Sequence, residues 1–228
     1  MGEVKRQQPH IGSDEAGKGD YFGPLAVAAV YADEVALERL PQAGVKDSKR
    51  VSSERRLWEL ERAVKQICPL FEVVVISPAR YNDLIEKMRN LNGLLAWGHA
   101  RAIENVLEKL GQAEACGTRG APRCRLAVAD QFGDERFLRE SLMKRGRQIE
   151  LVQQVRAEED PAVAAASTLA RAAFIRALER LSSEAGIDLP RGATHVLPAA
   201  REVYAKGGAA LLRQLAKVHF KTTKQVVG

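Results

Sequence analysis

The sequence has few cysteines, no long apolar run and no leader-like N-terminus, and each absence excludes a class of protein. Its three cysteines, Cys68, Cys116 and Cys124, are odd in number and form no CxxC pair, which argues against a disulfide framework and a zinc knuckle. No run approaches the roughly 20 apolar residues of a membrane span, and residues 1–8 lack the apolar core of a signal peptide. We therefore expect a cytoplasmic protein with no membrane partner.

Apolar residues and basic charge are what the sequence has in quantity. Hydrophobic residues make up 46% of the 228 residues, which is enough to bury one substantial core. The 35 Lys and Arg residues outnumber the 29 Asp and Glu residues, for a net charge of +6. This balance favours a phosphate-rich partner, although many basic proteins bind nothing acidic. The charged surface favours a monomer.

Alternating strand and helix patterns predict an α/β fold. A short first strand is expected to begin at Ile11. Four further strands are expected over residues 25–31, 71–76, 126–129 and 149–155. Helices are expected from Glu54 to before Pro69, from Pro78 to about Leu107 with a break at 90–92, over 135–145, and from Pro161 to about Leu181. Residues 111–124 are expected to form a loop, and the segment from Pro198 to be helical and basic.

Acidic residues stand where predicted strands end. Asp14 and Glu15 precede Gly17 and Gly19, and Asp130 ends an apolar strand. Neighbouring residues of a regular strand face opposite sides, so two adjacent carboxylates share one site only if the backbone leaves strand geometry there, which glycines permit. A carboxylate at the end of an apolar strand is costly unless it is solvated, paired or bound to a cation. Ligands also collect at strand ends in α/β sheets.

A fourth acid precedes the helix that begins at Pro161, and three residues are candidates. Asp160 is explained as an ordinary N-cap, because proline follows it at the first helical position. Glu158 lies outside that role, so we expect it to be the fourth member, with Glu159 and Asp160 as weaker candidates. Taken singly, each of the four acids is better explained as a solvated or capping carboxylate.

Carboxylates without a His/Cys ligand set favour a hard cation, Mg²⁺ or Mn²⁺. Two such ions roughly 3.5–4 Å apart can activate a water and stabilise the leaving oxygen in phosphodiester hydrolysis. The four acids in a basic protein therefore predict a metal-dependent site that acts on phosphodiesters.

Motifs along nearly the whole chain resemble the type 2 ribonucleases H, most closely those of the bacterial HIII type. The first is GSDEAGKGDYFGP at residues 12–24, whose DYFGP ending is closer to HIII than to HII. The others follow in order: KDSKR at 46–50, NLNGLLAWGHARAIE at 90–104, DQF at 130–132, RAE at 156–158, AVAAASTLAR at 162–171, LPRGA at 189–193 and AKVHFK at 216–221.

The resemblance implies a ribonuclease H-like α/β fold, which is a mixed β-sheet flanked by helices with a helical C-terminal extension. It divides the chain into a polar tail at 1–10, a catalytic domain at 11–197 and a basic helical segment at 198–228 packed on the same domain. The implied activity is metal-dependent, endonucleolytic hydrolysis of the RNA strand of RNA/DNA hybrids, giving 5′-phosphate and 3′-hydroxyl ends. Two Mg²⁺ or Mn²⁺ ions are implied at four catalytic, metal-binding acids: Asp14, Glu15, Asp130 and Glu158. A glutamate in the last place agrees with HIII, where HII has aspartate.

Substrate contacts are implied at three further places. The backbone of Gly17, Lys18 and Gly19 would approach the scissile region, where amides can recognise the ribose 2′-OH. A second set consists of Lys46, Ser48 and Lys49. These residues form either a basic cluster that holds phosphates or a solvated turn before a helix. Ser167 is either a packing residue or a phosphate contact, and the resemblance favours the contact.

Three matters stay open in the sequence. HIII relatives commonly carry an N-terminal domain resembling the TATA-binding protein, whereas thirteen residues precede Asp14 here, so either the hybrid is held without it or the chain is truncated. A rival activity is HII-like nicking at single ribonucleotides in duplex DNA. A rival of another class is a non-catalytic hybrid-binding module whose acids only cap secondary structure.

Overall fold

The computed structural model describes residues 8–45, 53–115 and 124–228, without the side chains of Glu114, Ala115 and Glu158. The chain divides into two compact units. The sheet unit comprises Met1–Glu15, Val27–Val74 and Asn92–Ala172. The helical unit comprises Ala16–Ala26, Val75–Leu91 and Ala173–Gly228.

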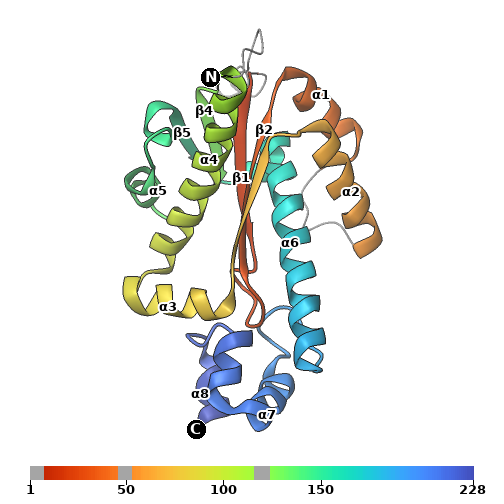
Figure 1. The fold of residues 1–228 in the computed structure, drawn as a ribbon, viewed down its shortest axis with the longest axis vertical. Helices are drawn as coiled ribbons and strands as arrows, with labels where there is room; N and C mark the ends of the chain where they lie inside the picture. The colour runs from red at the N-terminus through yellow and green to blue at the C-terminus, as the bar shows by residue number, and fades with distance from the viewer. Residues whose placement is uncertain (1–7, 46–52, 116–123) are drawn as a thin grey trace. The chain divides into compact units, whose positions relative to one another are not determined.

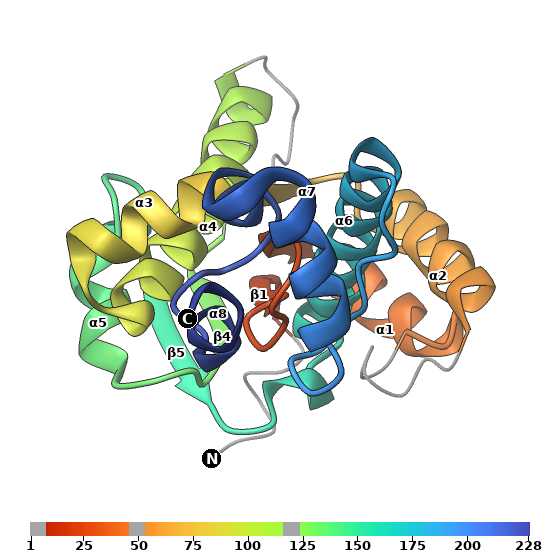
Figure 2. The ribbon, with the colours of Figure 1, turned by 90° about the horizontal axis from the view of Figure 1, so that it is seen from below.

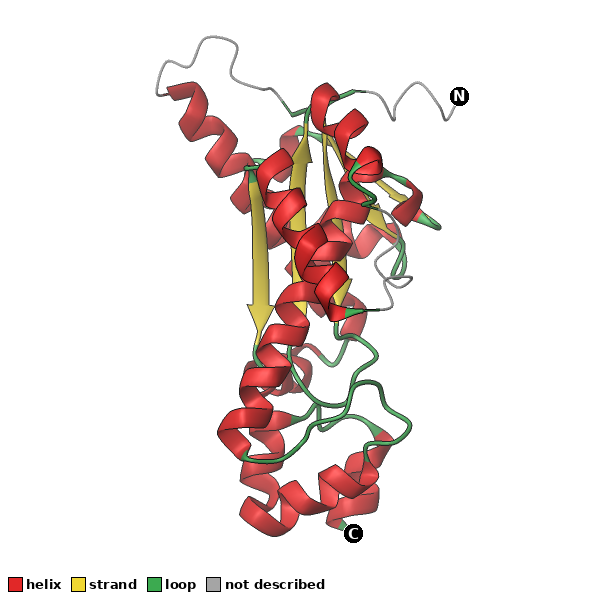
Figure 3. Ribbon diagram, turned by 90° about the vertical axis from the view of Figure 1, so that its right-hand side faces the viewer, coloured by secondary structure: helices red, strands yellow, loops and turns green. Residues whose placement is uncertain are grey.

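Five strands form one sheet in the order β3-β2-β1-β4-β5 (Figure 3). Their bounds are β1 (His10–Ala16), β2 (Leu25–Ala32), β3 (Phe71–Ile76), β4 (Leu126–Asp130) and β5 (Glu150–Gln154). Strands β1, β4 and β5 run parallel. The turn from β1 to its neighbour β2 is shorter than the crossover that a parallel pair requires, so the sheet is mixed. The expected mixed α/β sheet is confirmed.

The helices are α1 (Glu34–Gln42), α2 (Glu54–Ile67), α3 (Pro78–Met88), α4 (Leu91–Ala115), α5 (Glu135–Ser141), η3 (Gly146–Gln148), η4 (Ala157–Glu159), α6 (Pro161–Ala185), α7 (Leu197–Leu215) and α8 (Lys221–Val227). The capping signals located their starts well. The side chains of Ser53 and Ser77 accept hydrogen bonds from backbone amides of the first turns of α2 and α3.

Two expectations about the helices were wrong, and one helix was not predicted. Helix α4 continues to Ala115, so the predicted loop was wrong over residues 111–115, and residues 116–123 lie outside the described part. Helix α5 ends at Ser141 instead of residue 145, because the backbone leaves helical geometry at Leu142, with φ −58° and ψ 137°. Helix α1 was missed, although Asp33 caps it by accepting from Ala36 N at 2.8 Å. Its Pro41 lies in the last turn.

Two successive residues of β1 contact helices on opposite faces of the sheet. The Ser13 hydroxyl lies 2.7 Å from Nδ1 of His99 on α4. On the other face, a Cβ added to Gly12 would lie 2.1 Å from the backbone of Ala162, at the start of α6. This close approach requires glycine. Figure 1 shows α4 and α6 on opposite sides of β1, which makes this unit a three-layer α/β/α sandwich.

The helical unit contains α3, α7 and α8, in which α7 packs on both α3 and α8 (Figure 2). Helix α7 is interrupted at Gly207 and Gly208, whose backbone is not helical. Asn82 of α3 forms hydrogen bonds with the backbone of residues 216–218, which follow α7. Its Nδ2 donates to Ala216 O at 2.8 Å, and its Oδ1 accepts from Val218 N at 3.0 Å. Within the described ranges, no helix is long and apolar enough to cross a membrane.

Candidate active site

Asp14 and Asp130 occupy matching positions on neighbouring parallel strands. Ser13 of β1 pairs with Ala129 of β4, and each aspartate is the next residue along its strand. Paired residues of adjacent strands lie roughly 5 Å apart and direct their side chains to the same face. The sheet therefore brings two acids that are distant in sequence to the same edge, at the carboxyl ends of β1 and β4.

The Asp14 carboxyl is buried, with 5% of the residue exposed. Burial and, after it, the charge of Glu15 raise the pKa of Asp14 to about 7, although a hydrogen bond from Ser167, another from Glu15 N and the charge of His99 oppose the shift. Both raising effects act against the ionised carboxylate. A divalent cation beside Asp14 would counter them, so these oxygen donors fit a hard metal ion.

Glu15 contacts the α4 side of the sheet. Its Oε2 lies 3.1 Å from Nε2 of the fully buried His99, whose Nδ1 lies against Ser13. Asp14 contacts Ser167 of α6 instead. The expectation that the backbone leaves strand geometry at Asp14 and Glu15 was wrong: β1 continues to Ala16, and the left-handed conformation comes at Gly17, with φ 89°. The two side chains leave β1 on opposite faces, yet the carboxyls are close enough for the charge of Glu15 to raise the pKa of Asp14.

The hydrogen bond of Ser13 assigns the hydrogen on Nδ1 of His99. Ser13 donates its only hydroxyl hydrogen to Ala28 O at 2.9 Å. Nδ1 of His99 must therefore donate to the Ser13 hydroxyl. Nε2, on the other side of the ring, faces the Glu15 carboxyl at 3.1 Å.

Asp130 ties the end of β4 to the segment that contains Glu158. Its Oδ1 accepts from Ala157 N at 3.2 Å, in η4. Arg156, which precedes η4, has a left-handed conformation with φ 57° that turns the chain after β5. The Glu158 backbone thus follows directly on a residue bonded to Asp130, whereas its side chain lies outside the described part of the structure.

The two weaker candidates for the fourth acid have different surroundings. Glu159 is exposed. Asp160 is buried and caps α6, because its Oδ1 accepts from Ala162 N at 2.9 Å and from Val163 N at 3.2 Å, as the N-cap interpretation predicted. Asp160 also lies 3.0 Å from Nε2 of His10. These contacts give Asp160 a structural role.

Among the described side chains, no three His, Cys, Asp or Glu residues are grouped closely enough to form a ready-made metal site. The Glu158 carboxyl is not among them. The structure therefore shows the matching positions of Asp14 and Asp130, and the four-acid site stays a prediction.

The model of the Ribonuclease HII family matches residues 11–223. The chain belongs to the ribonuclease HII family. A protein of this family, Ribonuclease HIII of Protochlamydia amoebophila (strain UWE25), is 43% identical over 221 residues, which are 96% of this chain and 69% of the relative. Ribonuclease HIII of Chlamydia pneumoniae is 39% identical over 96% of this chain and 70% of the relative. The predicted resemblance to the type 2 ribonucleases H is confirmed.

Solved structures of the ribonuclease HII family agree. The crystal structure of Bst-RNase HIII in complex with Mn²⁺ matches with a TM-score of 0.84 and 29% identity, over 97% of this chain and 70% of that chain. Ribonuclease H2 from Pyrococcus horikoshii OT3 matches with a TM-score of 0.75 over 96% of this chain and 97% of that chain, and at 21% identity it supports the fold alone.

The residues that the resemblance to ribonuclease HIII implied as substrate contacts stay a prediction, and their surroundings differ. Lys46, Ser48 and Lys49 lie outside the described residues. Ser167 is buried against Asp14, so it lies beside a predicted metal ligand. The glycine turn, which consists of Gly17, Lys18 and Gly19, belongs to the helical unit. A Cβ on Gly17 would meet Pro24 O at 2.3 Å, whereas one on Gly19 would meet no atom within 4 Å.

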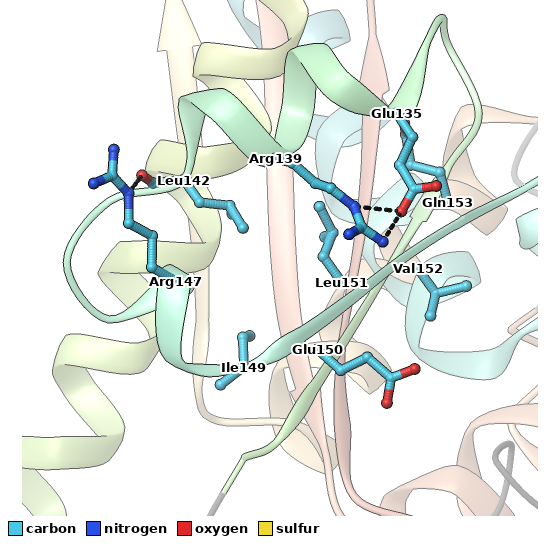
Figure 4. Close-up of a pocket in the computed structure, with 9 residues that line it drawn as sticks. All are labelled: Glu135, Arg139, Leu142, Arg147, Ile149, Glu150, Leu151, Val152 and Gln153. Carbon is cyan, nitrogen blue, oxygen red and sulfur yellow. Dashed lines mark hydrogen bonds and ion pairs between the residues drawn. The ribbon is translucent and has the colours of Figure 1, made fainter.

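A cavity of about 490 Å³ lies beside β5 (Figure 4). It is lined by the Glu135–Arg139 ion pair of α5 and by residues that include Leu142, Arg147 and Leu151. None of its lining residues is a predicted site residue.

His99 and Ser13 were not identified as site residues from the sequence. His99 contacts the Glu15 carboxyl through one ring nitrogen and the Ser13 hydroxyl through the other. Ser13 lies beside Asp14 in the first motif, and His99 belongs to NLNGLLAWGHARAIE, but nothing in their spacing relates them. The only available signal was a histidine in an otherwise apolar helical stretch, which is more often a core residue than part of a site.

Proposed function

We propose that this chain is a ribonuclease HIII-like endoribonuclease that hydrolyses the RNA strand of RNA/DNA hybrids, leaving 5′-phosphate and 3′-hydroxyl ends. Membership of the ribonuclease HII family supports the enzyme class. The observation that carries the proposal is the register of β1 and β4, which sets Asp14 and Asp130 side by side at the carboxyl edge of the sheet.

Asp14, Glu15, Asp130 and Glu158 would hold two Mg²⁺ or Mn²⁺ ions. The relative Bst-RNase HIII was crystallised with Mn²⁺, which supports a divalent metal. Bound ions would supply Lewis-acid activation of a water and charge stabilisation at the leaving oxygen. The protein would orient these carboxylates through Ser167, His99 and the amide of Ala157.

The hybrid would be recognised by the amides of Gly17, Lys18 and Gly19 and by the phosphate contacts of Lys46, Ser48 and Lys49. Gly19 supports this role because its Cα faces open space, where a sugar–phosphate backbone can approach closely. The net charge of +6 favours phosphate binding. We also propose that the protein is a monomer of the cytoplasm that serves DNA replication and repair, with its catalytic domain at 11–197 and a basic helical segment at 198–228.

Two rival functions share this fold. HII-like nicking at a single ribonucleotide in duplex DNA would use the same acids. A non-catalytic hybrid-binding module would need none of them, and the raised pKa of the buried Asp14, caused by burial and by Glu15, would then have no counterpart in function.

The test is an Mn²⁺- and Mg²⁺-dependence assay on an RNA/DNA hybrid, double-stranded RNA, single-stranded RNA and duplex DNA with one ribonucleotide. We expect cleavage of the hybrid alone, and only with metal. Asp14→Asn and Asp130→Asn should each raise the activation free energy of cleavage by several kcal/mol, which lowers the cleavage rate on the order of a thousandfold. Hybrid binding should be retained. Near wild-type turnover in either variant would falsify the assignment, and cleavage mainly at the lone ribonucleotide would favour the HII-like rival.

A further inference from the structure

Lys217 is a fully buried lysine in the helical unit. Its Nζ donates to two backbone carbonyls, Gly23 O at 2.7 Å and Asp20 O at 2.9 Å, and lies 5.6 Å from the centre of the Tyr81 ring. Both carbonyls belong to the GKGDYFGP stretch that follows the first acids. A lysine from the end of the chain is therefore bonded to the segment just after the glycine turn.

Burying an ammonium group costs free energy unless its hydrogen bonds are restored. Burial lowers the pKa of Lys217 to about 7, against the opposing attraction of the Asp20 charge. An apolar side chain would fill the same space at a lower desolvation cost. It could not, however, donate hydrogen bonds to the two carbonyl acceptors.

The backbone around Lys217 is paired with the same segment. Lys217 N donates to Tyr21 O at 2.8 Å, Gly23 N donates to Leu215 O at 2.9 Å, and Phe22 forms an antiparallel bridge with Ala216. The side chain of Lys217 adds two bonds to this pairing, at the first and last residues of the Asp20–Gly23 segment.

Asp20 connects this pairing to the glycine turn. Its amide donates to Gly17 O at 3.3 Å, which closes the turn, and its Oδ1 accepts from Gly192 N at 2.6 Å. In the third contact, its carbonyl accepts a hydrogen bond from Lys217 Nζ. Asp20 is thus bonded through its amide, its carboxyl and its carbonyl, to Gly17, Gly192 and Lys217. Of these three partners, Lys217 is the one that also bonds the other end of the Asp20–Gly23 segment, at Gly23 O.

We propose that Lys217 is a positioning residue for hybrid recognition: it fixes the Gly17–Gly19 turn in the orientation in which the turn's amides distinguish RNA from DNA by the ribose 2′-OH. This inference rests on the proposed function, which assigns the turn to substrate contact. Lys217 itself does not contact the substrate.

The test compares dissociation constants for an RNA/DNA hybrid and for the DNA duplex of the same sequence, measured without divalent ions so that no cleavage occurs. The wild type should prefer the hybrid. Lys217→Met should reduce that preference roughly threefold to tenfold, the size of one or two lost hydrogen bonds. Lys217→Arg, which keeps the charge and the donors, should restore part of it. Lys206→Met is the matched control, because Lys206 is exposed and bonds a single carbonyl, that of Ala185, in the same unit.

A folded Lys217→Met protein, as judged by circular dichroism and thermal melting, with the wild-type preference would overturn the inference. If that variant does not fold, Lys217→Gln, which keeps two N–H donors on a shorter side chain, takes its place, and a wild-type preference in it is equally decisive. A wild type with no preference for the hybrid would instead refute the proposed substrate recognition. The two failures are therefore distinguishable.

Discussion

The imidazole of His99 lies 3.1 Å from the Glu15 carboxyl and stacks on the ring of Phe132, with ring centres 4.9 Å apart. Phe132 is the third residue of the DQF motif that begins at Asp130. One buried side chain of α4 thus contacts Glu15 directly and, through Phe132, the loop that follows Asp130.

His99→Ala should weaken Mn²⁺ binding roughly tenfold to a hundredfold, because a residue that orients a metal ligand usually has an effect of that size. Titration calorimetry on the folded variant measures this without relying on activity. Ser13→Ala should give a smaller loss in the same direction, since Ser13 only orients His99. Mn²⁺ affinity equal to wild type in His99→Ala would show that His99 is merely a core residue.

Gly17→Ala and Gly19→Ala should separate stability from recognition. At Gly17 the backbone has φ 89° and a Cβ would meet Pro24 O at 2.3 Å, so alanine should cost about 3 kcal/mol or more of unfolding free energy. At Gly19 a Cβ meets nothing, so stability should stay within about 1 kcal/mol of wild type while hybrid affinity falls. Denaturant unfolding and hybrid binding are the two measurements. Unchanged hybrid affinity in Gly19→Ala would exclude close approach of the substrate there.

The His10–Asp160 pair should make stability depend on pH. Burial lowers the pKa of His10, but the hydrogen bond and the charge of Asp160 outweigh it, so the pKa lies above the ordinary 6.5. The stabilisation is therefore complete below pH 6.5 and is lost as the pH rises through the raised pKa of the folded state.

Asp160→Asn keeps a capping oxygen for α6 but removes the charge that His10 faces. The difference in unfolding free energy between wild type and variant should be larger at pH 6 than at pH 8. Equal differences at the two pH values would show that His10 is neutral throughout this range.

Gly12→Ala should destabilise the sheet unit. Its Cβ would lie 2.1 Å from the Ala162 carbonyl carbon and 2.2 Å from Val163 N, and backbone atoms of a helix cannot move away as a side chain can. We expect a loss of about 3 kcal/mol or more, measured by urea unfolding. Gly19→Ala is the reference, since it adds the same methyl group in open space. A loss below about 1 kcal/mol would mean that α6 shifts freely on the strand.

Local patterns predicted most elements of this fold. The strand at 71–76 was placed within its observed bounds, and serine caps located the starts of α2 and α3. The α4 error arose where a local signal was misleading, because small residues after 110 suggested a loop, and α1 was not predicted from the sequence. Packing decided where α4 ends, because a helix that buries its apolar face tolerates such residues.

The sequence by itself determined that carboxylates stand at strand ends and that Asp160 begins a helix, because strand periodicity and capping act over a few residues. Only the tertiary structure decided that Ser13 pairs with Ala129, that His99 faces Glu15 and that Lys217 reaches Asp20 and Gly23. Strand register and the burial of polar groups depend on contacts between residues far apart in the chain. No local pattern encodes which distant partner satisfies a given donor.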